Sequence, residues 1–330
     1  MSTAATTAHD PASPDGTAEA ILSARGVTMR FGGLTAVDDV DLDVFPGEIV
    51  GLIGPNGAGK TTFFNCLTGL YKPTEGSVTF DGSVLPPRPR RVVKAGMSRT
   101  FQNIRLFANM TALENVMVGR YCRTSAGPFT SIVHGPKFRR EEAETRDRAR
   151  ELLAYVGLGG YEEYLARNLP YGHQRRLEIA RALATDPKLV LLDEPTAGMN
   201  PQETRDATDL IFKIRDSGLA VVVIEHDMRF IFQLCDRVLC LVRGKTLVEG
   251  TPGEVQSDPR VIEAYIGTGD DEDEDEDGDG DGDEDTSAGS AAPAAVREEP
   301  SRGQVPPPAS PSHGAIGSET ETETEKDGGR

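Results

Sequence analysis

The chain has 330 residues and a formal net charge of −18 at pH 7, which is enough length for one large domain or two small ones. Residues 269–330 contain 20 Asp and Glu but only 4 Lys and Arg, so the first 268 residues hold 33 acids, 31 bases and a net charge of −2. The folded part therefore lacks the excess of positive charge that nucleic acid favours, and the acidic character of the whole chain says little about its partners.

The cysteines and the hydropathy exclude several further classes. Cys66, Cys122, Cys235 and Cys240 form no C-x-x-C pair and have no His cluster near them, which argues against a disulfide framework or a zinc site and fits a reducing cytoplasm. No apolar run approaches the roughly 18–20 residues that span a bilayer, so any membrane role should be peripheral. Residues 1–20 are predicted to be a disordered leader without the features of a secretory signal.

The first predicted elements are strands. From Ile21 to Gly54 the sequence has short β-rich runs broken by Gly and Pro, which predicts strands and hairpins. The last of these runs, GEIVGLIG, is an apolar strand that leads into a glycine-rich loop. The following KTTFFNCLTGL has helical spacing, with Cys66 interpreted as a small core residue.

The middle of the chain, about residues 98–165, is predicted to be mostly helical. Thr111 and Glu114, three positions later, form a capping box in MTALENVMVG. The segment TSAGPFTSIVHGPKF is predicted as a loop insertion. After it, REEAETRDRARELLAYVGL carries an apolar stripe at helical spacing, made of Ala149, Leu152, Leu153 and Val156.

The next segment alternates helices with apolar strands. A helix is predicted after Asn168 in HQRRLEIARALAT, and the nearly all-apolar strands KLVLLDEP and LAVVVIEHD follow, separated by the helix PQETRDATDLIFKIRDSG. Continuous apolar strands that alternate with helices indicate a parallel sheet buried on both faces. The predicted fold class is therefore α/β.

The C-terminal segment, residues 269–330, is predicted to be a disordered acidic tail. After Gly269 it has the acidic run DDEDEDEDGDGDGDED, and it cannot bury enough apolar surface to offset chain entropy. Asp277, Asp279, Asp281 and Gly282 fit the first half of a calcium loop, but the twelfth position is Ala288, where a bidentate Glu is needed. We therefore interpret the segment as a solvating tail.

The stretch GPNGAGKTT matches the phosphate-loop pattern G-x-x-x-x-G-K-[ST] completely, between a predicted strand and a predicted helix. Its glycines let the backbone N–H groups face phosphates, and the helix N-terminus adds its dipole. Lys60 is predicted to reach the β- and γ-phosphates, Thr61 to bind Mg²⁺ and Thr62 to reach a phosphate oxygen. The predicted nucleotide-binding residues of this loop are Gly54, Pro55, Asn56, Gly57, Ala58, Gly59, Lys60, Thr61 and Thr62.

Two acidic residues end the predicted strand LVLLDEP. Asp193 is expected in the Mg²⁺ coordination sphere through water, and Glu194 can polarise a water molecule for in-line attack on the γ-phosphorus. Together with the phosphate loop this pair predicts nucleoside triphosphate chemistry. It does not distinguish a kinase or a GTPase from a transporter motor.

Three further features make that distinction: Gln102 in RTFQNIRLF, the segment NLPYGHQRRLEIARAL just before LVLLDEP, and His226 in VIEHD. In this order the motifs resemble those of the ATP-binding subunits of ABC transporters. The resemblance implies a RecA-like core with an antiparallel β subdomain and an inserted helical subdomain at about 98–170. The whole ATP-binding domain would cover residues 21–268.

The resemblance also implies roles for single residues. Phe31 would stack on adenine, Gln102 would contact Mg²⁺ and the attacking water, and His226 would hold the γ-phosphate. The implied catalytic set is Lys60, Gln102, Glu194 and His226, and the implied metal set is Thr61, Gln102 and Asp193.

Residues 169–173 would be the signature of this family, and residues 197–200 its D-loop. Gly172 matches the second glycine of the usual L-S-G-G-Q and would bind nucleotide. Pro170, Tyr171 and His173 depart from that pattern, and Pro170 offers neither a hydroxyl nor an N–H group to the γ-phosphate. Binding at this end would then depend on the Gly172 backbone and the N-terminus of the following helix.

The resemblance narrows further over about residues 22–267. MRFGGLTAVDDV, RTFQNIRLFANMTALENV, LPYGHQRRLEIARAL, DEPTAGMNPQET and GTPGEVQSDPRVIEAYIG are together similar to the ATP-binding subunit of branched-chain amino acid importers. That family implies ATP and Mg²⁺ as ligands and a head-to-tail pair of ATPase subunits, with a heterodimer favoured over a homodimer. It also implies membrane permease subunits, an extracytoplasmic solute-binding protein as an indirect partner, and a place at the cytoplasmic face of the plasma membrane.

Several alternatives stay open because the transported solute never touches this subunit. Motors of urea or short-amide importers and of lipopolysaccharide exporters have similar motifs. A soluble ABC ATPase that acts on ribosomes or DNA is less favoured, because the chain has one phosphate loop, no sustained heptads and no basic excess. The signature and His226 argue against a phosphate-loop kinase.

Overall fold

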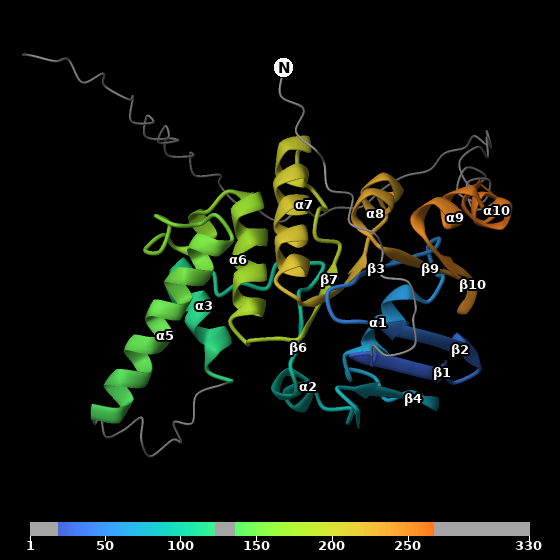
Figure 1. Cartoon of the computed structure of the whole chain (residues 1–330), viewed down its shortest axis with the longest axis horizontal. Coiled ribbons are helices and arrows are strands. Elements are labelled where there is room, and N and C mark those ends of the chain that lie inside the picture. Colours follow the sequence, from blue (N-terminus) through green and yellow to red (C-terminus); the bar gives the residue numbers. More distant parts are fainter. Residues whose placement is uncertain (1–18, 123–135, 267–330) are drawn as a thin grey trace, which may run out of the picture. The chain divides into compact units, whose positions relative to one another are not determined.

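The computed structural model describes residues 19–122 and 136–266 (Figure 1). The predicted leader, apart from its last two residues, lies outside this range, as do the predicted acidic tail and most of the predicted loop insertion. Within the described residues, none of the helices combines the length and the apolar character that a membrane span requires.

The first sheet is antiparallel and has the strand order β2-β1-β4-β5. β1 and β2 form a hairpin in which Phe31 pairs with Leu34, and Gly32 adopts a φ of 57° in the two-residue turn between them. Such turns favour glycine because a side chain is strained at positive φ. The strands are β1 (Leu22–Phe31), β2 (Leu34–Val44), β4 (Glu75–Phe80) and β5 (Ser83–Val84).

The second sheet has six strands in the order β10-β9-β3-β8-β7-β6. Its strands are parallel except β10, which pairs with β9 in the antiparallel sense. The central strands β3, β7 and β8 are buried at every residue, which confirms the predicted parallel sheet. The strands are β3 (Ile49–Ile53), β6 (Met97–Arg99), β7 (Leu189–Asp193), β8 (Ala220–Ile224), β9 (Arg237–Val242) and β10 (Lys245–Gly250).

Two hydrophobic cores lie on the two faces of this parallel sheet, because successive side chains of a strand point to opposite faces. Val50 and Leu52 of β3 belong to one core, and Ile49 and Ile53 to the other. The first core also contains helix α1 (Lys60–Leu67) and the inner face of the antiparallel sheet. Cys66 of α1 is buried there, as predicted, and burial raises the pKa of its thiol to about 11.

Helices cover the second core. α3 packs against both α5 and α6, as Figure 1 shows, and the predicted apolar stripe of α5 is buried in this contact. The predicted capping box of Thr111 and Glu114 is present at the start of α3. These helices are α3 (Ala112–Arg120), α5 (Pro136–Tyr155), α6 (Tyr171–Leu183), α7 (Pro201–Asp216), α8 (Met228–Leu234), α9 (Pro252–Ser257) and α10 (Pro259–Ile266).

The helical segment in the middle of the chain begins later than the sequence predicts. Residues 97–99 form strand β6, which pairs with β7 at the edge of the parallel sheet, and residues 100–110 contain no helix. A three-residue strand shows no periodicity, and its partner lies far along the chain, so the local sequence could not reveal it. The remaining short elements are α2 (Pro89–Ala95), which contacts β6, and the 3₁₀ turn η1 (Ala166–Asn168).

Candidate functional site

The predicted site residues follow neighbouring strands of the parallel sheet. The phosphate loop follows β3, Asp193 ends β7, and His226 comes just after β8. Gln102 follows β6 at the sheet edge. Because parallel strands end at one side of a sheet, these residues gather there although they are far apart in sequence.

The phosphate loop is packed tightly on one side and open on the other. A Cβ atom at Gly54 would lie 2.1 Å from the carbonyl oxygen of Leu241 in β9, and one at Gly59 would lie 2.3 Å from that of Ala36 in β2. A Cβ atom at Gly57 would meet nothing within 4 Å. The glycines of the motif therefore let the loop sit against the two sheets while Gly57 faces open space.

The start of α1 offers donors to an anion. Gly59, at the N-cap position, has a φ of 94° and no side chain to cap the helix. The first-turn N–H groups of Lys60, Thr61 and Thr62 have no acceptor within the helix, because such groups lie before the first helical hydrogen bond. Pro55 and Ala58 are buried and Asn56 is exposed. A helix N-terminus of this kind suits a phosphate group.

Lys60 folds back over the phosphate loop. Its Nζ atom donates hydrogen bonds to the carbonyl oxygens of Gly54 and Pro55, at 2.5 and 2.9 Å. Burial lowers the pKa of this ammonium group, while the carboxylate of Glu194 acts in the opposite direction. A buried ammonium group that donates to carbonyl oxygens can transfer these hydrogen bonds to phosphate oxygens, which carry negative charge.

Glu194 occupies a strained position directly after β7. Its φ is 46°, a conformation that costs a residue with a side chain about 1–3 kcal/mol and persists only where the surroundings enforce it. The Glu194 N–H donates to the carbonyl oxygen of Ile224 in β8, at 2.9 Å. Its carboxylate accepts from Gln102 Nε2 at 2.9 Å and lies 2.7 Å from His226 Nε2. The structure thus brings three of the predicted catalytic residues into direct contact.

The turn after Glu194 is anchored by a residue that the sequence analysis missed. Glu225 is buried, and its Oε1 atom accepts hydrogen bonds from the backbone N–H and the hydroxyl group of Thr196, at 2.8 and 2.6 Å. The N–H of His226 lies 3.2 Å from the other carboxylate oxygen. Glu225 therefore ties the turns after β7 and β8 together.

Asp193 is neutralised by Arg99, a second residue that sequence reasoning missed. The Arg99 Nη2 atom lies 2.7 Å from Asp193 Oδ2, and both side chains are nearly buried. Arg99 Nη1 also donates to Asn65 Oδ1 of α1 at 2.6 Å. This ion pair links β6, β7 and α1.

The donor set fits a magnesium ion. The hydroxyl of Thr61, the amide oxygen of Gln102 and the carboxylate of Asp193 are oxygen ligands of the type that Mg²⁺ prefers. Gln102 uses its amide nitrogen toward Glu194, which leaves its oxygen for a cation. Because Arg99 already pairs with Asp193, contact between Asp193 and a metal through water fits better than direct ligation.

Phe31 lies at the end of β1 with 43% of its surface exposed. Its ring meets Tyr71 edge to face, with 5.5 Å between the ring centroids and an interplanar angle of 78°. The sequence analysis did not single out Tyr71. The exposed ring of Phe31 is available for stacking against a planar base.

The predicted signature lies against the segment after β7. Gly172 is in the first turn of α6, and a Cβ atom there would lie 2.5 Å from Glu203 Oε1. Glu203 itself forms a capping box with Asn200, at the start of α7. A side chain at position 172 would therefore displace the Glu203 carboxylate from its capping box, which favours glycine at this position.

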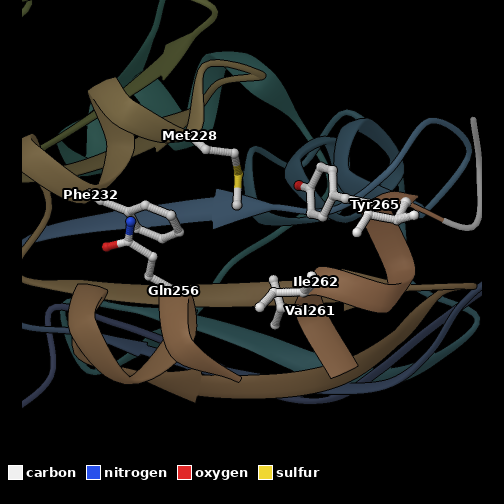
Figure 2. A pocket seen from close by; sticks show the side chains of 7 residues that line it. Met228, Phe232, Gln256, Val261, Ile262 and Tyr265 are labelled. Carbon is white, nitrogen blue, oxygen red and sulfur yellow. The ribbon is translucent and has the colours of Figure 1, made fainter. Parts of the chain in front are cut away.

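Tyr265 of α10 reaches the phosphate loop from the C-terminal part of the domain. Its hydroxyl oxygen accepts a hydrogen bond from the Gly54 N–H at 2.7 Å, and burial raises the pKa of this hydroxyl. The ring borders an apolar pocket between α8 and α10 that Met228, Phe232 and Ile262 also line (Figure 2). No local pattern could have indicated this contact, because the two residues are 211 positions apart.

Comparisons with known proteins place the chain among transport ATPases. Residues 37–197 match the family described as ABC transporter, and residues 245–271 match the branched-chain amino acid ATP-binding cassette transporter family. The chain is 45% identical over 249 residues to the high-affinity branched-chain amino acid transport ATP-binding protein LivG of Escherichia coli K12, covering 75% of this chain and 98% of that protein.

Two further similarities are informative. The lipopolysaccharide export system ATP-binding protein LptB of Haemophilus influenzae is 35% identical over 250 residues, covering 75% of this chain and 97% of that protein. The crystal structure of MJ1267 in its ADP conformation, an ATP-binding cassette of an ABC transporter, has a TM-score of 0.67 and 32% identity and covers 76% of this chain and 99% of that one. These cassettes confirm the predicted α/β cassette fold.

Proposed function

The chain belongs to the branched-chain amino acid transport ATP-binding proteins, a family of ABC transporter ATPases, and we propose that it powers the import of branched-chain amino acids through a membrane permease. The observation that carries the mechanism is the contact of Gln102 and His226 with the strained Glu194 at the edge of the parallel sheet.

The phosphate loop and Phe31 bind ATP. Lys60 moves its hydrogen bonds from the loop carbonyls to the β- and γ-phosphates, and the first-turn amides of α1 with Thr62 complete the phosphate site. Phe31 stacks on the adenine. Thr61, Gln102 and Asp193 would hold Mg²⁺, and the cation would supply positive charge for the phosphate oxygens.

Glu194 acts as the base. It accepts a proton from a water molecule whose oxygen attacks the γ-phosphorus in line, while the bond to the β–γ bridging oxygen breaks and leaves ADP and phosphate. Gln102 and His226 hold the carboxylate in place. In this proposal His226 then also donates a hydrogen bond to the γ-phosphate.

ATP closes a head-to-tail pair of ATPase subunits. Each nucleotide lies between the phosphate loop of one subunit and the signature of the other, with Gly172 as the closest signature residue. A ligand shifts an equilibrium only by its differential affinity for the two states. To change the ratio of closed to open pairs from about 1:99 to 99:1, ATP must prefer the closed pair by about 5.5 kcal/mol. Hydrolysis removes the γ-phosphate and with it the preference for the closed pair.

The working complex contains other proteins. We propose a related ATPase subunit as the second member of the pair, permease subunits that receive the closing motion, and an extracytoplasmic solute-binding protein that acts through the permease. The chain would then sit at the cytoplasmic face of the plasma membrane, held there by the permease.

Reconstitution tests this function. The chain is placed in liposomes with the related ATPase subunit, the permease encoded by neighbouring genes and the cognate binding protein. ATP hydrolysis is then measured with leucine, isoleucine or valine. We expect stimulation by one or more of these solutes and uptake of the same solute. Equal turnover with and without the permease, or no stimulation by any of the three amino acids, would contradict the proposal.

Lipopolysaccharide export is the second candidate, because the LptB relative is 35% identical over nearly its whole length. The same assay separates the two. Stimulation of turnover by lipopolysaccharide in the liposome membrane, with no response to branched-chain amino acids, would favour export over import.

A further inference from the structure

We propose that Tyr171 and Arg175 of α6 are positioning residues that connect the signature to two segments within one subunit. One is the segment of residues 100–110, here named the glutamine loop after Gln102, and the other is the D-loop turn, residues 197–200. Tyr171 stands where the usual signature has its first glycine. The inference rests on the proposed ATPase function, and it assigns a role to a departure from the family pattern that the nucleotide chemistry alone does not explain.

Arg175 is the centre of this arrangement. Its side chain is 4% exposed, and its Nη1 atom donates to the carbonyl oxygen of Phe101 at 2.9 Å. Its Nη2 atom donates to the carbonyl oxygen of Gln102 and, at 3.0 Å, to the hydroxyl oxygen of Tyr171. A planar guanidinium group with fixed donor directions sets the position of each acceptor that it binds.

The contact with Gln102 leads directly to the candidate base. Arg175 holds the backbone carbonyl of Gln102, and the side chain of the same residue donates to Glu194. Residues 100–110 contain no helix, so helical hydrogen bonds do not fix this backbone. A displacement of Arg175 should therefore change the position of the Gln102 amide group relative to Glu194.

Tyr171 connects the same arginine to the D-loop. It lies one helical turn before Arg175, and a Cβ atom at Gly198 would be 3.3 Å from the Tyr171 ring. Gly198 has a φ of 75°, a conformation that favours glycine. Between Glu194 and Gly198, the N–H of Ala197 donates to the Glu194 carbonyl oxygen. The tyrosine ring thus rests on the turn that follows the base.

The far end of the glutamine loop has its own contacts with α6, although Glu178, which makes one of them, also pairs with Arg175 at 3.5 Å. Glu178, also on α6 and 2% exposed, accepts a hydrogen bond from the Arg105 N–H at 3.0 Å, and Arg181 donates to the Arg105 carbonyl oxygen. Removal of the Arg175 contacts therefore leaves the loop attached to α6 at residue 105. The expected effect is a shift of Gln102 rather than detachment of the loop.

The arrangement gives the signature helix a direct mechanical connection to the catalytic carboxylate. When a second subunit and its nucleotide press on the signature, a shift of α6 moves Tyr171 and Arg175 together. That shift reaches Glu194 through Gln102 on one side and through the D-loop turn on the other. Hydrolysis would then depend on the engagement of the signature, whereas nucleotide capture at the phosphate loop would not.

Steady-state ATP hydrolysis by the full chain in its reconstituted complex tests the inference. Arg175→Gln should lower kcat roughly ten- to hundredfold, the loss expected for hydrogen bonds from a charged group. KM for ATP should stay within about twofold, because Arg175 binds none of the phosphate-loop residues. Arg175→Lys should restore part of kcat.

A double-mutant cycle separates positioning from simple packing. Tyr171→Phe keeps the ring on Gly198 but removes the hydroxyl that Arg175 binds, and it should lower kcat roughly two- to tenfold. The double variant Tyr171→Phe/Arg175→Gln should be no slower than Arg175→Gln alone, because the hydroxyl then has no partner to hold.

Arg176→Gln is the matched control. Arg176 is the next residue on α6 and pairs with Asp206 of α7 at 2.5 Å, so its loss removes a similar ion pair without touching Gln102. Equal kcat values for Arg175→Gln and Arg176→Gln, fully additive effects in the cycle, or a change in KM alone would overturn the inference.

Two further results have to be distinguished: a variant that does not fold, and an unmodified complex without ATPase activity. If thermal unfolding shows that Arg175→Gln does not fold, Tyr171→Phe and Arg175→Lys replace it. Tyr171 is 42% exposed, so its substitution should be tolerated. Unchanged kcat in both variants would overturn the inference. If the unmodified complex does not hydrolyse ATP, the proposed function itself fails, which is a different result from an active wild type with unaffected variants.

Discussion

The phosphate-loop end and the signature end of this chain, which would face two different nucleotides in the proposed pair, are built in different ways. The phosphate-loop end is one continuous segment, residues 54–62, whose glycines, lysine and helix start lie next to one another in sequence. The signature end depends on contacts between segments far apart, such as Arg175 with Phe101 and Tyr171 with Gly198. The difference teaches that nucleotide capture is a local property of this chain, whereas the placement of the base is a property of the assembled fold.

The largest expected effect is a loss of ATP hydrolysis with ATP binding left intact. Glu194→Gln removes the base, and we expect turnover to fall by at least about 10²–10³, as for the loss of one essential catalytic interaction. Binding of ATP should be nearly unchanged, because the phosphate loop keeps its contacts. Hydrolysis and equilibrium binding of a fluorescent ATP analogue measure both, and normal hydrolysis would remove Glu194 from its role.

The next effect concerns the packing of the phosphate loop. Gly54→Ala places a methyl group 2.1 Å from the Leu241 carbonyl oxygen, and such overpacking typically costs about 1–3 kcal/mol or more. Gly57→Ala is the matched control, because it meets nothing within 4 Å and carries only the strain of its φ of 72°, about 1–2 kcal/mol. Thermal unfolding should show the larger loss for Gly54→Ala; the reverse order would contradict the packing argument.

A smaller effect is expected at the hydrogen bond between α10 and the phosphate loop. Tyr265→Phe removes the long-range hydrogen bond from the Gly54 N–H to the tyrosine hydroxyl, worth about 0.5–1.5 kcal/mol. We expect KM for ATP to rise roughly two- to tenfold while kcat stays within about twofold. Tyr155→Phe loses a comparable bond to the Lys213 carbonyl oxygen and should leave KM unchanged. A fall in kcat alone for Tyr265→Phe would argue against a role in the phosphate loop.

The smallest effect is predicted for removal of the acidic C-terminal segment. A chain cut after Gly267 keeps every contact described for the candidate site, since all of them involve residues up to Tyr265. ATPase activity should therefore be nearly unchanged at a fixed salt concentration. A large loss, measured against the full chain in the same complex, would mean that the segment regulates the enzyme.

Much of the architecture could be predicted from periodicity and composition. The buried strands β3, β7 and β8, the capping box at Thr111 and the apolar stripe of α5 all follow local rules of side-chain spacing. Strand β6 could not be predicted, because three residues carry no period and its hydrogen bonds go to β7. The continuous apolar strands predicted a sheet that is buried on both faces. Which helices cover which face could be learned only from the packing.

The sequence by itself determined the phosphate loop, because its function depends on backbone conformations and side chains within nine successive residues. It also placed Gln102, Glu194 and His226 in the order expected of a transport ATPase. Only the tertiary structure decided that Gln102 and His226 meet on one carboxylate, that Arg99 neutralises Asp193 and that Tyr265 reaches Gly54. These contacts join residues that are brought together by strand order and helix packing. Neither the strand order nor the helix packing can be predicted from the local sequence.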